Sequence, residues 1–165
     1  MRDALIVSTA RTPLGKSYRG AFNNTTAPTM AGWAIEEAVK RSGVDPAKVD
    51  DVIMGAALQQ GTSHGNIARN AALAAGLPVT VSGMSIDRQC SSGMMAISTA
   101  AKQIITDGMD IVIGGGLDSI SLVQTQKMNL DRYVDKKLVA KHNHIYMPML
   151  QTAEVVAKRY KISRE

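Results

Sequence analysis

VSGMSIDRQCSSGMMAISTAAKQIIT, from Val81 to Thr106, contains a strand pattern followed at once by a helix pattern. Val81 to Ile86 is a short apolar run that predicts a strand, and Cys90 to Thr106 has the apolar spacing of a helix that Asp107-Gly108 ends. The residues expected on its buried stripe are Ile97, Ala101, Ile104 and Ile105. A strand that passes within a few residues into an apolar helix is typical of α/β proteins, where reactive groups lie at the carboxyl ends of strands.

Cys90, the single cysteine, lies at this junction between strand and helix. Unpaired N–H groups and the positive dipole end at a helix start favour the thiolate, which is the form that attacks a carbonyl or a thioester. A lone cysteine is also often a small buried apolar side chain, so position alone leaves both interpretations open. A single cysteine excludes an intrachain disulfide framework and fits a reducing compartment, and we expect a cytoplasmic protein.

The same alternation of strand and helix patterns extends back to the amino terminus and stops near residue 119. Strands are predicted at Ala4–Thr9, Val49–Ala57 and Met109–Gly114, and helices at Met30–Ser42 and Asn66–Ala75. Repeated strand-helix units favour parallel neighbours, so we predict an α/β fold. After residue 119 only Thr152–Tyr160 has a helical stripe. We therefore expect two domains, residues 1–118 and residues 119–165.

The net charge of +5 is concentrated in the second of these segments. Residues 1–118 hold ten basic and ten acidic side chains, whereas residues 119–165 hold nine basic and four acidic ones. A basic segment beside a neutral core indicates an anionic partner, although an ordinary solvated face is the alternative. Aromatic residues make up only 4% of the chain, which argues against nucleic acid. The amino-terminal apolar run is too short for a signal segment or a membrane span, so no membrane partner is expected.

Other candidate sites give weaker signals. Gly114-Gly115-Gly116 follows a predicted strand, and we expect these glycines to allow close backbone packing around the Cys90 helix rather than to hold a phosphate. The histidines are His64, His142 and His144, and none has partners at metal-ligand spacing, so no metal site is expected. None of them is tied by spacing to Cys90 as a general base.

Five motifs in order along the chain resemble the thiolase family. They are Ala10-Arg11-Thr12-Pro13-Leu14-Gly15-Lys16, Gly65-Asn66-Ile67-Ala68-Arg69, Arg88-Gln89-Cys90-Ser91-Ser92-Gly93, Gly114-Gly115-Gly116-Leu117-Asp118-Ser119-Ile120-Ser121, and Thr152-Ala153-Glu154-Val155-Val156-Ala157 with Ile162-Ser163-Arg164-Glu165. Two positions depart from the family pattern, since Asp87 stands where the family usually has Asn and Asp118 where it usually has Glu.

The resemblance implies an acyltransferase in which Cys90 becomes acylated and its backbone N–H helps to hold the thioester oxygen. The expected reaction is thiolytic cleavage of 3-ketoacyl-CoA to acetyl-CoA and a shortened acyl-CoA, or the reverse condensation. Coenzyme A and acyl-CoA would be substrates, with no permanently bound cofactor. Residues 119–165 would begin the inserted loop domain that covers coenzyme A. Family members form homodimers or tetramers, and the contact is expected near Val81–Ile86.

The resemblance is closer to degradative, fatty-acid β-oxidation enzymes than to biosynthetic ones. The motif around Cys90 and the pair Pro148-Met149 both favour the degradative type. Met147 and Met149 would then line an apolar site for the acyl chain, because methionine adapts to irregular apolar surfaces.

The family is built from two similar halves, and this sequence matches only the first. The mixed sheet expected for that half lacks its final strand here. The family's catalytic histidine and second cysteine lie in the other half. We therefore expect an amino-terminal fragment whose partner is the missing carboxy-terminal half and which has no turnover alone. There are two alternatives. One is another condensing enzyme of the same superfamily, and the other is a non-catalytic domain that binds an anionic ligand.

Overall fold

The computed structural model describes residues 2–165, and their contacts divide the chain into two compact units, one ending at Met128 and one spanning Asn129–Glu165. The helices and strands in chain order are α1 Ala27–Ser42, β1 Asp51–Gly55, α2 Ile67–Ala74, β2 Ser82–Ile86, α3 Ser92–Lys102, β3 Val112–Gly116, α4 Ile120–Val123, α5 Lys136–Lys141 and α6 Met149–Tyr160. Short 3₁₀ turns occur at Pro46–Lys48 and Gly61–Ser63, and a π-helical turn at Gln103–Asp107 extends α3.

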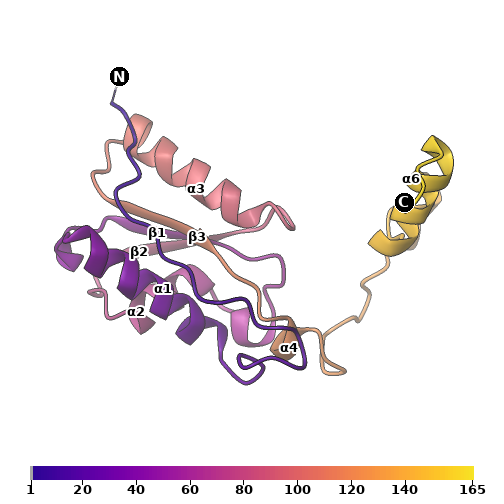
Figure 1. Ribbon diagram of the computed structural model, residues 1–165, viewed down its shortest axis with the longest axis horizontal. Coiled ribbons are helices and arrows are strands. Elements are labelled where there is room, and N and C mark those ends of the chain that lie inside the picture. Colours follow the sequence, from indigo (N-terminus) through magenta and orange to yellow (C-terminus); the bar gives the residue numbers. More distant parts are fainter. Residues whose placement is uncertain (1) are drawn as a thin grey trace. The chain divides into compact units, whose positions relative to one another are not determined.

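The sheet of the first unit is parallel, with β1 between β2 and β3 in the part of the chain that the structure describes. The register places Asp51 beside Ser82 and Val112, and it runs without interruption to the other end of the strands. This confirms the parallel α/β architecture predicted from the alternating patterns. Figure 1 shows α3 on one side of the sheet and α1 and α2 on the other.

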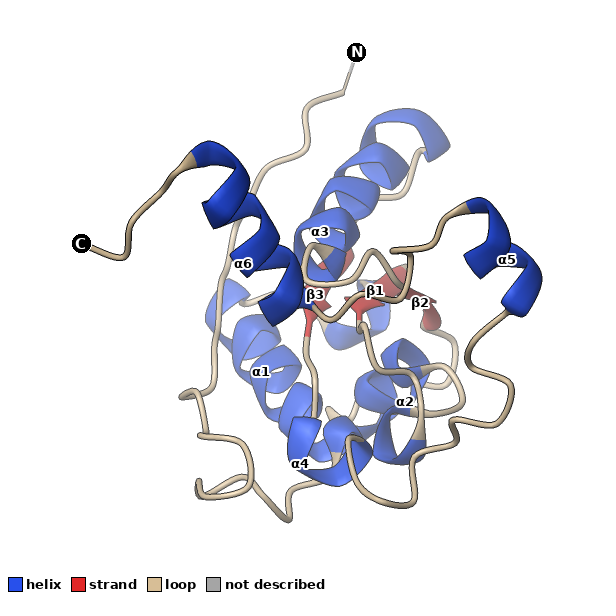
Figure 2. Ribbon diagram, turned by 90° about the vertical axis from the view of Figure 1, so that its right-hand side faces the viewer, coloured by secondary structure: helices blue, strands red, loops and turns tan. Residues whose placement is uncertain are grey.

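The core forms because β1 is apolar on both faces, as expected of a strand covered by helices on each side. All five of its residues are buried. Val52 and Met54 pack in the cluster that contains α1 and α2, whereas Ile53 packs against Ala96 and Ala100 of α3. The result is a helix–sheet–helix arrangement, which the end-on view of Figure 2 also displays.

The boundaries of the helices follow local capping chemistry. α1 begins at Ala27, three residues before the predicted start, because Pro28 suits the first turn of a helix. It ends at Gly43, which takes the left-handed conformation with φ 69°. The Asn66 side chain accepts a hydrogen bond from the Arg69 N–H and so caps α2.

The predicted first strand, Ala4–Thr9, is wrong as a strand. The segment forms no ladder among the described residues, and Leu5, Ile6 and Val7 are about three-quarters exposed, at 76%, 78% and 73%. Its apolar pattern favours an extended chain, but a strand also requires a hydrogen-bonding neighbour at its edge.

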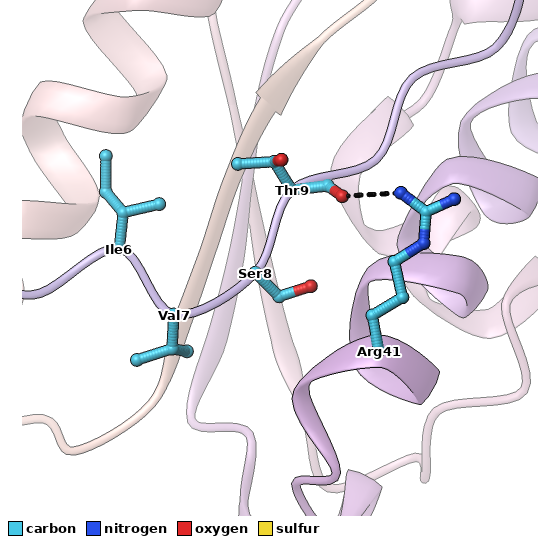
Figure 3. Close-up of a pocket in the computed structure, with 5 residues that line it drawn as sticks. All are labelled: Ile6, Val7, Ser8, Thr9 and Arg41. Carbon is cyan, nitrogen blue, oxygen red and sulfur yellow. Dashed lines mark hydrogen bonds between the residues drawn. The ribbon is translucent and has the colours of Figure 1, made fainter.

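The amino-terminal segment is nevertheless held by specific contacts. Arg2 donates to the Gly108 carbonyl at 3.1 Å, the Ser8 hydroxyl donates to the Ala38 carbonyl at 2.7 Å, and Arg41 donates to the Thr9 carbonyl at 2.9 Å. Figure 3 shows the Arg41 side chain directed at the Thr9 carbonyl. Arg41, Thr9 and the residues from Ile6 to Ser8 line an open cavity of about 360 Å³. These hydrogen bonds hold the segment in place, but its apolar side chains stay exposed to solvent.

The buried stripe predicted for α3 is also wrong. Ile97 and Ile105 are 48% and 37% exposed, and Ala101 and Ile104 are only partly buried. The side chains that face the sheet are the small ones, Ser92, Ala96 and Ala100. Helical periodicity cannot tell which apolar face packs when both faces are apolar, and the close approach of this helix to the sheet selects the small side chains.

The second unit, Asn129–Glu165, contains α5 and α6, and none of its residues is buried. α6 starts at Met149, three residues before the predicted helix, and α5 has no counterpart in the prediction. The rings of Tyr133 and Tyr146 lie 5.5 Å apart, and the Tyr146 hydroxyl accepts from the Asp135 N–H. Residues 119–128, which contain α4, belong to the first unit rather than to this one.

Within residues 2–165, no helix combines the length and the apolar character needed to cross a membrane.

Candidate active site

Cys90 lies on the short turn that joins β2 to α3, and its side chain is exposed. The turn leaves the carboxyl end of a parallel strand, which is where α/β proteins commonly place reactive groups. Gln89, immediately before the cysteine, has φ 49° and is therefore left-handed. This conformation is uncommon for a non-glycine residue and strains its backbone.

Hydrogen bonds from both side chains and backbone shape the turn. The Asp87 carboxylate accepts from the Gln89 N–H at 2.7 Å, and the Ser91 N–H donates to the Arg88 carbonyl at 3.1 Å. The Ser92 hydroxyl accepts from the Arg88 N–H at 2.8 Å and donates to the Gln89 carbonyl at 2.5 Å. These bonds set the backbone on both sides of Cys90.

Asp87 shapes the turn through its side chain. The contact uses one side-chain oxygen as an acceptor, and a carboxylate and an amide oxygen both provide it. The Asp87 side chain therefore supports the turn three residues before the candidate nucleophile.

Glycines bring the start of α3 against the sheet. A Cβ on Gly55 would lie 2.1 Å from the Ser92 carbonyl carbon, and a Cβ on Gly116 would lie 2.7 Å from the Gly93 Cα. A Cβ on Gly114 would lie 2.9 Å from the Ile97 Cα. Only glycine fits at these distances. The predicted packing against the Cys90 helix is confirmed for Gly114 and Gly116, whereas a Cβ on Gly115 would lie 3.2 Å from the Met54 sulfur instead. Gly55 packs against this helix in the same way, although its place in the sequence did not indicate it.

The loops after the three strands are tied to one another near the turn. The Ala56 N–H donates to the Ile86 carbonyl, and the Leu117 N–H donates to the Gly55 carbonyl, each at 3.0 Å. Asp118 accepts from the Ala57 and Leu58 N–H groups at 3.1 and 3.0 Å.

Asp118 therefore fixes the loop after β1 to the end of β3. Sequence reasoning noted it only as a departure from the family pattern. An acidic residue directly after a glycine-rich strand end was the signal available for this role, because carboxylates accept strongly from backbone N–H groups.

The other candidate residues are three histidines and two methionines. Among the described residues, no hydrogen bond joins Cys90 to a histidine, and no group of three or more His, Cys, Asp or Glu side chains could hold a metal ion. Met147 and Met149 lie in the second unit at the start of α6, where Met149 is 73% exposed. The arrangement thus offers an accessible thiol on a rigid turn, which is suited to covalent catalysis once an acid and a base are supplied.

Comparison with known proteins identifies relatives over the whole chain. The family model described as "Thiolase, N-terminal domain" matches residues 4–165. A 3-ketoacyl-CoA thiolase of Bacillus subtilis is 38% identical over 165 residues, covering 100% of this chain and 42% of the relative. An acetyl-CoA acetyltransferase of Cupriavidus necator is 38% identical over 177 residues, covering 100% of this chain and 44% of the relative.

A solved structure of an acetyl-CoA acetyltransferase is also similar to this chain. The crystal structure of the Bacillus anthracis acetyl-CoA acetyltransferase superposes with a TM-score of 0.84 and 37% identity, covering 99% of this chain and 43% of the other. The chain therefore spans less than half the length of these relatives.

Proposed function

The chain belongs to the thiolase family, and on that premise we propose that it carries the nucleophile of an acyltransferase that cleaves 3-ketoacyl-CoA. The observation that carries this proposal is the exposed thiol of Cys90 on a hydrogen-bonded turn at the carboxyl end of the sheet. A fixed, accessible thiol is what nucleophilic attack on a carbonyl requires.

In the proposed reaction the Cys90 sulfur attacks the ketone carbon of 3-ketoacyl-CoA. The π electron pair of that carbonyl moves onto its oxygen. This pair re-forms the carbonyl as the bond between the ketone carbon and the adjacent carbon of the acetyl-CoA portion breaks. Acetyl-CoA leaves after protonation, and the shortened acyl group stays on the sulfur. Coenzyme A then attacks this thioester and carries the acyl group away. The reverse sequence is the condensation.

The Cys90 N–H would hold the carbonyl oxygen during attack, as backbone donors do in other acyl transfers. The turn supports this role because the N–H groups of Ser91 and Ser92 are already used in its own hydrogen bonds. Coenzyme A and acyl-CoA act as substrates, with no permanent cofactor. The degradative type is favoured by Pro148-Met149, with Met147 and Met149 lining the acyl chain.

The acid and base belong, in this proposal, to the carboxy-terminal half of the same protein. Uncovered apolar surface supports such a partner. Two apolar side chains of α3, Met94 and Ile97, are 77% and 48% exposed. β3 has a strand neighbour on one side only in the described residues, and the amino-terminal segment is open beside it. Surface of this kind ordinarily marks an interaction site.

We place the assembled enzyme in the cytoplasm as a homodimer or tetramer that contacts itself near Val81–Ile86. In the part of the chain that the structure describes, β2 has a strand neighbour on one side only, and such an edge is a template for pairing. Light scattering of the full-length protein is expected to give at least a dimer, and a stable monomer would contradict the contact. Cell fractionation tests the location.

Intact-mass analysis tests the reaction. Full-length protein incubated with acetyl-CoA should gain one acetyl group, and Cys90→Ser should gain none. An adduct that persists in Cys90→Ser, or no adduct on the wild type, would exclude the proposed role of Cys90.

The incomplete site makes a separate prediction. Purified residues 1–165 should give no thiolytic turnover, and adding the carboxy-terminal half as a second chain should restore it. Turnover by residues 1–165 alone would show that the acid and base lie within them.

A further inference from the structure

We propose that Ser92 is a positioning residue whose hydroxyl aims the Cys90 N–H at the oxygen of the reacting carbonyl. The proposal rests on the proposed function and assigns a role to a side chain that does not touch the substrate. Ser92 is the first residue of α3, and it is only 3% exposed. Burial of a hydroxyl is favourable only where it is hydrogen-bonded, and here both its donor and its acceptor are used.

Ser92 holds the Gln89 carbonyl with two donors at once. Its hydroxyl donates to that oxygen at 2.5 Å and its backbone N–H donates at 3.0 Å. The same hydroxyl accepts from the Arg88 N–H at 2.8 Å. One side chain thus joins the Asp87–Arg88 peptide and the Gln89–Cys90 peptide to the start of the helix.

The direction of the Cys90 N–H follows from peptide geometry. The Gln89 carbonyl and the Cys90 N–H belong to the same peptide unit, and no peptide bond in the described chain is cis. In a planar trans peptide the carbonyl and the N–H point to opposite sides. Because Ser92 fixes the carbonyl toward the helix, the Cys90 N–H must point away from it.

The remaining bonds of the turn leave this N–H available. Among the described residues, the hydrogen bonds within the turn use the N–H groups of Arg88, Gln89, Ser91 and Ser92 and do not use that of Cys90. A donor held in one direction before the substrate arrives needs no reorganisation when charge develops on the oxygen.

The left-handed backbone of Gln89 explains why such anchoring is needed. A φ of 49° is a strained backbone conformation for a non-glycine residue. Without the hydroxyl, one of the two donors on its carbonyl is lost and the Arg88 N–H loses its acceptor. The peptide between Gln89 and Cys90 can then rotate toward a relaxed conformation and take the N–H with it.

The test separates the reactivity of the thiol from the use of the N–H. Alkylation of Cys90 by iodoacetamide needs only the thiolate, whereas acylation by acetyl-CoA also needs a donor for the carbonyl oxygen. Both rates are measured on the full-length protein for wild type, Ser92→Ala, Ser92→Thr and the control Ser98→Ala, which removes an exposed hydroxyl farther along the same helix.

In Ser92→Ala, we expect acylation to slow by about tenfold or more while alkylation stays within about threefold of wild type. Ser92→Thr, which keeps the hydroxyl, should recover most of the acylation rate, and Ser98→Ala should match wild type in both assays. Equal slowing of both reactions in Ser92→Ala would mean a merely structural role and would overturn the proposal. Unchanged acylation would overturn it as well.

Failure of the proposed function has a different signature. If wild-type protein is not acylated at Cys90, the acyl-transfer proposal fails, and the position of the peptide is then judged directly. Crystal structures of Ser92→Ala and Ser98→Ala should show the peptide between Gln89 and Cys90 rotated in the first and unchanged in the second. An unrotated peptide in Ser92→Ala would reject the positioning role.

Discussion

β1 and the amino-terminal segment Ala4–Thr9 have similar apolar sequences and opposite surroundings. β1 pairs with a strand on each side, and every one of its residues is buried. In the amino-terminal segment, Leu5, Ile6 and Val7 are about three-quarters exposed and unpaired. The difference shows that an apolar run specifies an extended chain, whereas burial depends on neighbours that the run does not itself contain.

The largest effect on stability is expected from a substitution where β1 packs against α3. Gly55→Ala should destabilise residues 1–165 by more than about 4 kcal/mol, or prevent folding, because the new Cβ would lie 2.1 Å from a backbone carbon that cannot retreat. Urea unfolding measures the change. The matched control is Gly93→Ala, whose Cβ would lie 3.5 Å from its nearest neighbour, at ordinary contact distance. Equal stability of the two variants would contradict the close packing.

A second pair of substitutions compares the two apolar segments directly. Ile53→Ala should cost about 3 kcal/mol of unfolding free energy, because Ile53 is fully buried. Ile6→Ala should cost less than about 0.5 kcal/mol in the same chain, because Ile6 is 78% exposed.

The same Ile6→Ala substitution in the full-length protein tests whether the carboxy-terminal half covers the amino-terminal segment. If the carboxy-terminal half covers the amino-terminal segment, Ile6→Ala should there cost more than about 1 kcal/mol in the same urea titration. A cost that stays below this in full-length protein would mean that the segment remains uncovered.

Asp118 offers a smaller effect at the loop that follows β1. Asp118→Ala removes the acceptor of the Ala57 and Leu58 N–H groups and should cost about 1 kcal/mol. Hydrogen exchange at these two amides should accelerate. Asp118→Asn keeps an acceptor oxygen and should lose less. Unchanged exchange in Asp118→Ala would mean that the loop is held by other contacts.

The smallest effect concerns the anchoring of the amino-terminal segment. Ser8→Ala removes the bond to the Ala38 carbonyl and should cost about 0.5 to 1 kcal/mol. Because the segment is otherwise open, limited proteolysis within residues 4–9 should become faster, whereas Ser98→Ala should leave it unchanged. Cleavage at the wild-type rate in Ser8→Ala would show that Arg2 and Arg41 suffice as anchors.

Local patterns predicted the regular elements of the first unit well because their signals are short-range. Gly43 ends α1 and Gly76 follows α2, both in the left-handed conformation that glycine allows. The parallel direction of neighbouring strands was predicted from the strand-helix alternation, whereas their order in the sheet was not. Two wrong predictions in this unit share a feature, because Leu5 to Val7 and part of α3 are apolar surfaces that the described residues leave uncovered.

For the candidate site, the residue types around Cys90 and the glycines after β3 were enough to predict a candidate nucleophile and a close helix contact. The contributions of Gly55, Ser92 and Asp118 could not be predicted. Each depends on a partner from another strand, or on the exact path of a turn, that spacing in the sequence does not specify.

Composition, periodicity and motif order thus sufficed for the α/β class, the family and the position of Cys90, because these depend on local propensity and on residues adjacent in the chain. The tertiary structure alone established which face of α3 packs, which apolar run becomes a strand, and how the Gln89 carbonyl is held. Those outcomes depend on distances between residues far apart in the sequence and on the direction of individual hydrogen bonds, neither of which a linear pattern contains.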